Sequence, residues 1–394
     1  MREEPGAPDH PLAGKKILFL LGSLQLGGAE RQVLLLARYL KSACGADPQV
    51  WGFGEPGRMS MLCTEYGIPW QVMPIALSRH LPGLIAALVR YASAVRRVGP
   101  DVLLPYTFFP NVIAGLVWRT SGARCCIWNQ RDEGIGFTNR PIQRVAAWLT
   151  PRFIANSMGG EKFLEGALGV APGAIAIIEN GVELEPPRLD RLNWRDRLGV
   201  DETRLVACML ANLSHYKDHA TLLRAWRVLL HEQERGRPLL VLAGIFGDAY
   251  DSLQALCEVL DLGGDVLFLG SVDDVSGLLG AVDIGVFSSR SEGCPNGVLE
   301  CMASGLPLVA SDVPAIRRVL GDNADLQTFP AGDHVALSAA VAALLANVHL
   351  RRTLGQANRI RAEQAFSPRA MCERVVGVMV DVLNRAPLPR DVTR

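Results

Sequence analysis

Short apolar segments alternate with segments of helical periodicity along almost the whole chain, and this alternation constrains the fold more than any other feature. A strand that is apolar on both faces must be covered on both sides, and helices between successive strands provide that cover. We therefore predict an α/β protein with parallel sheets. Strands are predicted at 17–21, 49–53, 70–73, 102–105, 125–128, 153–156, 175–178, 205–210, 239–243, 266–269, 284–288 and 308–311. Helices are predicted near 29–42, 84–98, 111–120, 140–150, 158–168, 333–346, 349–365 and 369–384.

The alternation is interrupted once, at the charged and proline-bearing stretch 183–192, which is typical of a hinge. We therefore expect two Rossmann-like domains, at 15–182 and 201–366, joined by a linker at 183–200. Residues 1–14, rich in proline and charge, are expected to be a disordered lead. Parallel sheets bind ligands at the carboxyl ends of their strands, so a cleft between the two domains is the expected site.

Composition excludes several classes of protein. Lys+Arg and Asp+Glu both number 40, so no global charge favours nucleic acid, although residues 1–182 carry 18 basic and 13 acidic side chains. The nine cysteines are scattered and form no CxxC pair, which gives a zinc site little support. No signal peptide is visible, so we expect reduced thiols and a cytoplasmic protein. No apolar run approaches the ~18–20 residues that span a bilayer.

The first strand is followed by a glycine loop, residues 22–31. It is neither the dinucleotide GxGxxG fingerprint nor a P-loop, because Gly28 stands where a P-loop has its lysine. Gly27 and Gly28 open a helix, so backbone amides can approach a ligand closely there. An ordinary tight turn accounts for the loop equally well.

The stretch 288–307 carries the sharper signal, because a buried strand ends at Ser288 and a helix is predicted to begin near Asn296. The first amides of that helix have no intrahelical partners and suit a phosphate. Glu300, one turn inside, can accept hydrogen bonds from a ribose, and Glu292 can reach a second polyol. Together they would bracket a nucleotide sugar, although each glutamate taken singly is explained by helix capping or a solvated loop.

Glu292 and Glu300, separated by seven residues, and the trailing segment 303–307 resemble the E-x7-E signature of retaining GT-B glycosyltransferases of family 4. Four further segments resemble that family in its own order, so that the resemblance covers about residues 15–385. They are the glycine loop 27–31, the Asn-Gly-Val at 180–182, the segment 211–219 and the Phe-Leu-Gly-Ser-Val at 268–272.

The resemblance implies a GT-B fold, in which two Rossmann-like domains face each other across a cleft. The first domain would bind the acceptor, with a C-terminal helix at about 367–388 packed back on it, and the second would bind the donor. Lys217 would hold the diphosphate and Glu292 the transferred sugar, as the catalytic pair. The remaining donor-binding residues would be Asn212, Leu269, Val272, Asn296, Gly297, Val298 and Glu300, with Gly27 and Gly28 approaching the distal phosphate and acceptor. Leu269 and Val272 would line the base pocket, and Glu300 would hold the ribose.

The resemblance also implies no metal and no cofactor other than a UDP- or GDP-sugar donor. The chain contains no Asp-x-Asp, and Lys217 with the helix dipole would replace the metal. Two positions depart from the family. Asn212 stands where the family usually has an arginine, a role that Arg290 or Lys217 with backbone amides could fill. The stretch 128–133 lacks the histidine that the family often places there.

We therefore expect a hexosyltransferase-type enzyme (EC 2.4) that transfers a sugar, with retention, to a hydroxyl of a glycan or lipid-linked acceptor in cell-surface polysaccharide synthesis. A nucleotide-sugar 2-epimerase of the same fold and a non-catalytic nucleotide-sugar-binding protein are the alternatives. The helix predicted at 84–98 combines apolar side chains with Arg90, Arg96 and Arg97, so it could touch the inner face of the membrane. A solvated helix of the domain is the favoured interpretation of that segment.

Overall fold

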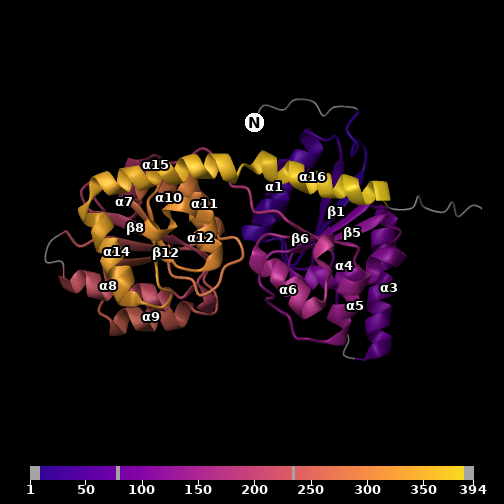
Figure 1. Ribbon diagram of the computed structural model, residues 1–394, viewed down its shortest axis with the longest axis horizontal. Helices are drawn as coiled ribbons and strands as arrows, with labels where there is room; N and C mark the ends of the chain where they lie inside the picture. The colour runs from indigo at the N-terminus through magenta and orange to yellow at the C-terminus, as the bar shows by residue number, and fades with distance from the viewer. Residues whose placement is uncertain (1–8, 77–79, 233–235, 386–394) are drawn as a thin grey trace, which may run out of the picture. The chain divides into compact units, whose positions relative to one another are not determined.

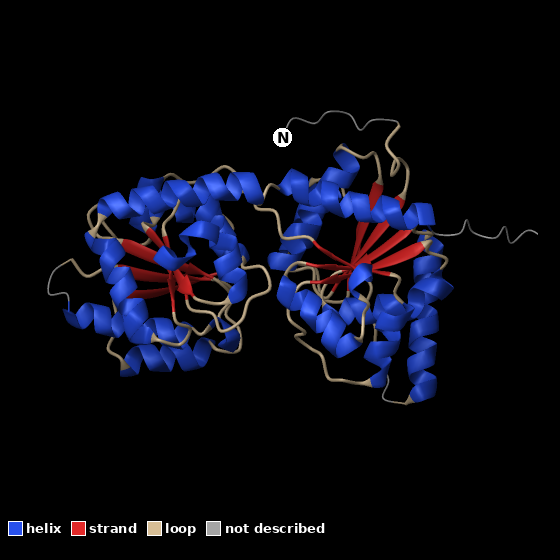
Figure 2. Ribbon diagram, viewed as in Figure 1, coloured by secondary structure: helices blue, strands red, loops and turns tan. Residues whose placement is uncertain are grey.

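The computed structural model describes residues 9–76, 80–232 and 236–385, and it divides into two compact units. Unit 1 comprises the chain up to Gly181 together with the segment from Pro368 onward, and unit 2 comprises Val182–Ser367. Each unit is a parallel sheet between layers of helices (Figures 1 and 2). The prediction of two parallel-sheet α/β domains is confirmed.

Unit 1 holds a seven-stranded sheet in the order β3-β2-β1-β4-β5-β6-β7. Its strands are β1 (Lys16–Leu21), β2 (Asp47–Gly52), β3 (Trp70–Val72), β4 (Val102–Pro105), β5 (Cys125–Gln130), β6 (Arg152–Ala155) and β7 (Ile175–Ile177). Its helices are α1 (Gly28–Ser42), α2 (Arg58–Glu65), α3 (Leu81–Val98), α4 (Phe108–Ser121), α5 (Pro141–Leu149), α6 (Met158–Leu168), the 3-10 turn η1 (Pro172–Ala174) and α16 (Pro368–Arg385). Side chains of α1, α2 and α16 fill the core on one face of the sheet, and those of α3, α4, α5 and α6 fill the other.

Unit 2 holds a six-stranded sheet in the order β10-β9-β8-β11-β12-β13. Its strands are β8 (Val206–Leu210), β9 (Leu239–Ala243), β10 (Val266–Gly270), β11 (Ile284–Phe287), β12 (Leu308–Ser311) and β13 (Thr328–Phe329). Its α-helices are α7 (Arg191–Arg197), α8 (His219–Glu232), α9 (Tyr250–Val259), α10 (Val275–Ala281), α11 (Asn296–Ala303), α12 (Pro314–Leu320), α13 (Ala324–Gln327), α14 (His334–Ala346) and α15 (Val348–Ala365). The 3-10 turns are η2 (His215–Lys217) and η3 (Gly321–Asn323).

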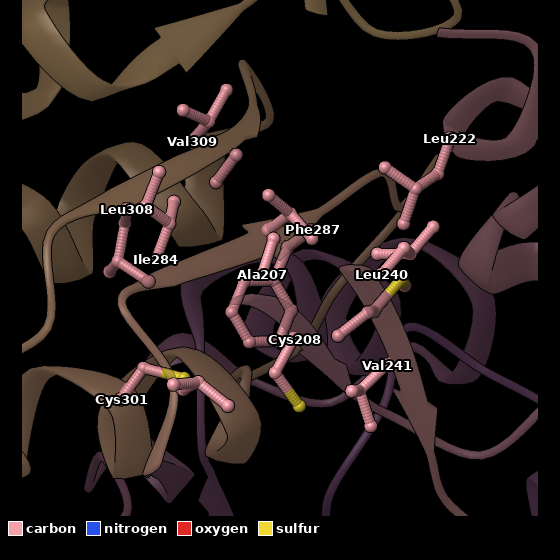
Figure 3. Packing of buried hydrophobic residues seen from close by; sticks show 14 of the residues in the cluster. Ala207, Cys208, Leu222, Leu240, Val241, Ile284, Phe287, Cys301, Leu308 and Val309 are labelled. Carbon is pink, nitrogen blue, oxygen red and sulfur yellow. The ribbon is translucent and has the colours of Figure 1, made fainter. Parts of the chain in front are cut away.

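The core of unit 2 explains why its strands read as unbroken apolar runs. Ala207 of β8 pairs with Leu240 of β9 on one side and with Ile284 of β11 on the other. Figure 3 shows the buried side chains that gather around this centre, among them Ala207, Cys208, Leu222, Leu240, Val241, Ile284, Phe287, Cys301, Leu308 and Val309. Because helices cover both faces, side chains on either side of each strand are removed from water.

The chain leaves unit 1 and returns to it at adjacent points. A Cβ on Gly181 would lie 2.6 Å from Cα of Pro368, so only glycine fits beside the returning chain. The Gln32 side chain fixes Gly181 by donating to its carbonyl at 2.9 Å and accepting from its amide at 3.0 Å. Beyond Pro368, α16 lies against α1 and β5 (Figure 1). The Asn-Gly-Val segment is therefore shaped by this close approach.

Two predicted boundaries need correction. The expected linker 183–200 contains α7, which packs on α10 in unit 2; Trp194 is buried there and donates to Asp274 Oδ2 at 2.7 Å. Residues 1–8 of the expected disordered lead lie outside the described residues, but residues 9–14 form turns. Leu12 is fully buried in the core of unit 1, and the Gly14 amide donates to the Gly45 carbonyl at 2.8 Å. Apolar burial orders both segments.

Candidate functional site

The sheet of unit 2 has a topological switch point between β8 and β11. From β8 the chain adds β9 and β10 on one side, then crosses to place β11 on the other side of β8. The loops that follow β8 and β11 therefore diverge, and such a crevice is where open parallel sheets bind ligands. The loop after β8 carries Lys217, and the loop after β11 carries Glu292.

Lys217 and Glu292 form a bidentate ion pair across this switch point. Nζ of Lys217 lies 2.6 Å from Oε1 and 2.8 Å from Oε2 of Glu292. The Ser289 hydroxyl donates to Oε1 of the same carboxylate. The side chain of Glu292 is 7% exposed and that of Lys217 16%, so both charges are largely withdrawn from water. Ser289 was not among the predicted site residues, because a serine in a loop carries no pattern of its own.

The N-terminus of α11 is seated directly on the end of β8. A Cβ on Gly297 would lie 2.2 Å from the Leu210 carbonyl oxygen and 2.9 Å from Cε1 of Phe287, so the helix can approach this closely only with glycine. The helix begins at Asn296, as predicted, and Val298 points into the core. Its first amides and the positive end of its dipole therefore lie at the carboxyl edge of the sheet, in the geometry that binds phosphate.

Glu300 lies one turn inside α11 and is 8% exposed. A carboxylate at this depth is costly to bury unless hydrogen-bond donors or cations surround it. Helical side chains lean toward the N-terminus of their helix, so Glu300 lies at the same end of α11 as the first backbone amides, which have no intrahelical partners. The helix thus combines anion-binding amides with a carboxylate that can accept hydrogen bonds from hydroxyl groups.

Asn212 follows β8 and is exposed. Its Oδ1 accepts a hydrogen bond from the Ile245 amide at 3.2 Å, so one end of the side chain fixes the loop after β9. Arg290, considered above as a replacement for the family arginine, instead places Nη2 3.3 Å from Oδ1 of Asp218, with 72% of its side chain exposed. The structure therefore directs the Arg290 guanidinium toward Asp218.

Leu269 and Val272 are half-buried against the core of unit 2 at the end of β10. The aromatic ring of Phe246, from the loop after β9, lies beside Gly270, since a Cβ on Gly270 would be 3.3 Å from Cζ of Phe246. Phe246 stacks on Tyr250 with ring centroids 4.0 Å apart and is 46% exposed. Sequence reasoning missed Phe246 because a lone aromatic after a strand is usually core.

His219 follows the Lys217 loop and is 1% exposed, and neither ring nitrogen has a hydrogen-bond partner among the described residues. Burial, together with the nearby Lys217 charge, lowers the pKa of His219 to about 4. The imidazole is therefore neutral at physiological pH. It adds no positive charge beside Lys217.

In unit 1 the switch point lies between β1 and β4, and Gly27 and Gly28 follow β1. The Gly27 amide donates to Oε2 of Glu30 at 3.2 Å, which caps α1, and burial raises the pKa of Glu30. Thr107, after β4, has φ 69°, a strained backbone for a residue other than glycine. No sequence signal indicates such a conformation, and strained residues cluster at functional sites.

The loop after β5, where the family histidine is missing, carries Arg131. Its guanidinium binds Asn180 Oδ1 and lies 5.2 Å from the ring centre of Tyr106. Asp132 accepts from the Gly134 and Ile135 amides, both at 2.7 Å, and burial raises its pKa. This edge of unit 1 is therefore polar and rich in hydrogen-bonding groups.

Within residues 9–76, 80–232 and 236–385, no group of three or more His, Cys, Asp or Glu side chains is arranged to hold a metal ion. In the same part of the chain, no single helix is long and apolar enough to cross a membrane. Two consecutive helical segments, His334–Ala346 and Val348–Arg385, are long and apolar enough only when they are taken together, and they meet at a bend of 102°.

Two family models match the chain in succession. "Glycosyltransferase Family 4" matches residues 26–186, and "Glycosyl transferases group 1" matches residues 190–361. The chain is 27% identical over 328 residues to the putative glycosyltransferase EpsF of Bacillus subtilis, covering 76% of this chain and 79% of that protein. It is 23% identical over 258 residues to an Escherichia coli UDP-Gal:alpha-D-GlcNAc-diphosphoundecaprenol alpha-1,3-galactosyltransferase, covering 62% of this chain and 65% of the relative.

Solved structures show the same fold. Anabaena Alr3699/HepE in complex with UDP and glucose superposes with a TM-score of 0.80 at 20% identity, covering 93% of this chain and 99% of that one. WaaG, a glycosyltransferase involved in lipopolysaccharide biosynthesis, superposes with a TM-score of 0.70 at 16% identity, covering 92% and 99%. The chain therefore belongs to the group 1 glycosyltransferases of family 4, enzymes of the hexosyltransferase type built on the GT-B fold.

Proposed function

We propose that this glycosyltransferase moves a hexose from a nucleotide-diphosphate sugar to a hydroxyl group of a glycan or lipid-linked saccharide, with retention of configuration. The observation that carries the proposal is the ion pair of Lys217 and Glu292 beside the N-terminus of α11, at the switch point of unit 2. This arrangement offers a cation and orphan amides to a diphosphate, and carboxylates to the sugars on either side of it.

The donor would lie along the carboxyl edge of the unit 2 sheet. Amides at 296–298 and the Lys217 ammonium would bind the diphosphate, and Glu300 would accept hydrogen bonds from the ribose. Leu269, Val272 and the exposed ring of Phe246 would contact the base, since an aromatic face stacks well on a flat heterocycle. Asn212 would contribute its side-chain amide to the diphosphate.

The HepE complexes contain UDP, UDP with glucose, and UDP-glucose, and the E. coli relative is named for a UDP-galactose donor and a diphosphoundecaprenol-linked acceptor. We therefore propose a UDP-hexose as the first donor to test, with a GDP-sugar second. The acceptor would bind unit 1 beside Gly27 and Gly28, and the product would enter a cell-surface polysaccharide or glycolipid. The reaction would take place in the cytoplasm.

The chemistry would be a front-face substitution. The bond between the anomeric carbon and the diphosphate oxygen breaks, the acceptor oxygen bonds to the same face, and the leaving diphosphate takes the acceptor proton. Lys217 and the α11 amides would stabilise the charge that develops on the leaving group without a metal ion. Glu292 is tied to Lys217 and Ser289, which makes its carboxylate a poor nucleophile and supports an orienting role.

The test is incubation of the protein with labelled UDP- and GDP-hexoses, with and without saccharide acceptors, with and without EDTA. We expect a new glycoside whose anomeric configuration matches the donor, formed equally in EDTA. An epimerised donor would identify a 2-epimerase instead. Binding without turnover across the whole donor and acceptor panel would identify a nucleotide-sugar-binding protein.

A further inference from the structure

Lys217 and Glu292 already satisfy each other's charge. Nζ of Lys217 lies 2.6 and 2.8 Å from the two carboxylate oxygens of Glu292, and the two side chains are only 16% and 7% exposed. Two of the three protons of the ammonium are therefore used by one carboxylate. A diphosphate that binds this ammonium must take it from Glu292 or share it with Glu292.

The surroundings offer Glu292 no replacement for this cation. In the described part of the chain, its one further side-chain partner is the neutral hydroxyl of Ser289. The Arg290 guanidinium lies 3.3 Å from another carboxylate, and 72% of its side chain is exposed. His219 is neutral at physiological pH, because burial and the neighbouring ammonium lower its pKa to about 4. A buried carboxylate without a cation is costly, so Glu292 resists the departure of the ammonium.

The backbones of the two loops are tied together beside the ion pair. The Arg290 amide donates to the Tyr216 carbonyl at 3.0 Å, and the buried Ser288 hydroxyl donates to the Asp218 carbonyl at 3.0 Å. Lys217 stands between these two contacts, and its ammonium is carried on a flexible stem of methylene groups. Exchange of the ammonium between two anions therefore needs rotation about side-chain bonds and no movement of the loops.

We propose that Glu292 and the donor diphosphate compete for the Lys217 ammonium, and that this competition makes the site prefer a sugar-bearing nucleotide to the bare nucleoside diphosphate. When a complete donor binds, the ammonium turns to the diphosphate, and sugar hydroxyls donate to the carboxylate that it leaves. A bare nucleoside diphosphate takes the same ammonium but brings no sugar hydroxyl to Glu292, so it binds more weakly.

This competition assists release of the spent nucleotide, because the ion pair re-forms when the ammonium leaves the diphosphate. Glu292 is thereby a specificity-determining residue that distinguishes the donor from the nucleotide product. The inference rests on the proposed function, since it takes the diphosphate to lie at Lys217 and the transferred sugar at Glu292.

The test is calorimetric titration of the full chain with UDP, UDP-glucose and UDP-galactose, and in parallel with GDP and GDP-mannose, all without acceptor. The unmodified protein should bind its sugar nucleotide more tightly than the corresponding bare diphosphate. Glu292→Gln releases the ammonium, so the bare diphosphate should bind about tenfold more tightly, and the affinity for the sugar nucleotide should change by less than about threefold. Glu258→Gln, which removes an exposed carboxylate of the same unit, is the matched control and should bind every ligand as the unmodified protein does.

Glu292→Asp separates competition from simple repulsion between two anions. It keeps the negative charge but shortens the side chain, so the carboxylate withdraws from the ammonium. Competition predicts that the bare diphosphate binds about threefold more tightly, whereas repulsion predicts no gain. In a Lys217→Met background, Glu292→Gln should alter the affinity for the bare diphosphate by less than about twofold, because no ammonium remains to be released.

An affinity for the bare diphosphate that is unchanged or lower in Glu292→Gln or in Glu292→Asp would overturn the inference and leave the proposed function intact. An equal gain from Glu292→Gln with and without Lys217 would overturn it as well. If the unmodified protein binds none of the five nucleotides, the proposed function fails and the inference fails with it.

Discussion

Nζ of Lys217 lies 2.6 and 2.8 Å from the two carboxylate oxygens of Glu292, although the two residues are 75 positions apart in the chain. The cation proposed for the leaving diphosphate and the carboxylate proposed for the transferred sugar therefore form one unit before any donor binds. Each residue sets the electrostatic surroundings of the other, so a substitution at either position acts on both.

Replacement of Lys217 by methionine should lower both stability and turnover. It leaves the Glu292 carboxylate buried without its cation, which costs about 3–5 kcal/mol of the free energy of unfolding. Urea denaturation and initial rates at saturating donor measure the two effects. Lys162→Met, at an exposed helical position, is the matched control. The double variant Lys217→Met with Glu292→Gln should lose less stability than the sum of the single variants, and additive losses would contradict the pairing.

Replacement of Glu300 by alanine should weaken donor binding more than it slows turnover. A hydrogen bond between a charged acceptor and the ribose hydroxyls is worth about 1.5–3 kcal/mol, which corresponds to a dissociation constant raised roughly 10- to 150-fold. Calorimetric titration of the folded variant with UDP measures this directly. An unchanged affinity would remove Glu300 from the ribose site.

Glu292→Gln should lose turnover more than donor affinity, because its hydroxyl contacts orient the sugar as positive charge develops on the anomeric carbon. Product from an α-linked donor should be α-linked by NMR. A retaining glycosidase needs two carboxyl groups about 5–5.5 Å apart and forms a glycosyl ester. Mass spectrometric detection of such an ester on Glu292, or a β-linked product, would refute the front-face mechanism.

Gly297→Ala should displace α11 from β8. Its Cβ would meet the Leu210 carbonyl oxygen at 2.2 Å, and overpacking of this kind costs about 1–3 kcal/mol. Because the first amides of α11 move with the helix, affinity for UDP should fall as well. Gly280→Ala, where a Cβ meets nothing within 4 Å, should stay within about 1 kcal/mol of the unmodified protein and bind UDP normally. Equal behaviour of the two variants in thermal unfolding and UDP titration would contradict the packing argument.

His219 should make the protein less stable in acid. Its folded pKa of about 4 lies below the ordinary value of 6.5, so the unfolded chain binds a proton first as pH falls. The contribution of neutral His219 to the free energy of unfolding is fully present above pH 6.5 and is lost progressively toward pH 4. It amounts to about 3 kcal/mol. Unfolding curves of His219→Leu should lack this component, whereas exposed His231→Gln should keep it. If the difference in stability between His219→Leu and the unmodified protein stays constant from pH 7 to pH 4, His219 is not the source of the loss of stability in acid.

Local pattern was sufficient for most of the fold. The strands at 102–105 and 308–311 have the predicted bounds, and α11 begins at the predicted residue. The short helix α2 (Arg58–Glu65) and the two-residue strand β13 (Thr328–Phe329) were not predicted, because segments this short carry too few periodic positions. The helix α7 within the expected linker was also not predicted, because it is ordered by contacts of Trp194 and Arg195 with α10 and not by a local pattern.

The sequence by itself determined the alternation of strands and helices and the family, and it indicated the residues that we propose for a donor site, because all of these depend on hydrophobic period and on short motifs. Only the tertiary structure decided which of those residues meet. It paired Lys217 with Glu292, directed Arg290 to Asp218, brought Phe246 beside Gly270 and strained Thr107. Each of these contacts joins segments far apart in the chain or depends on packing around a turn. Strand order and close packing, which no local pattern encodes, bring those segments together.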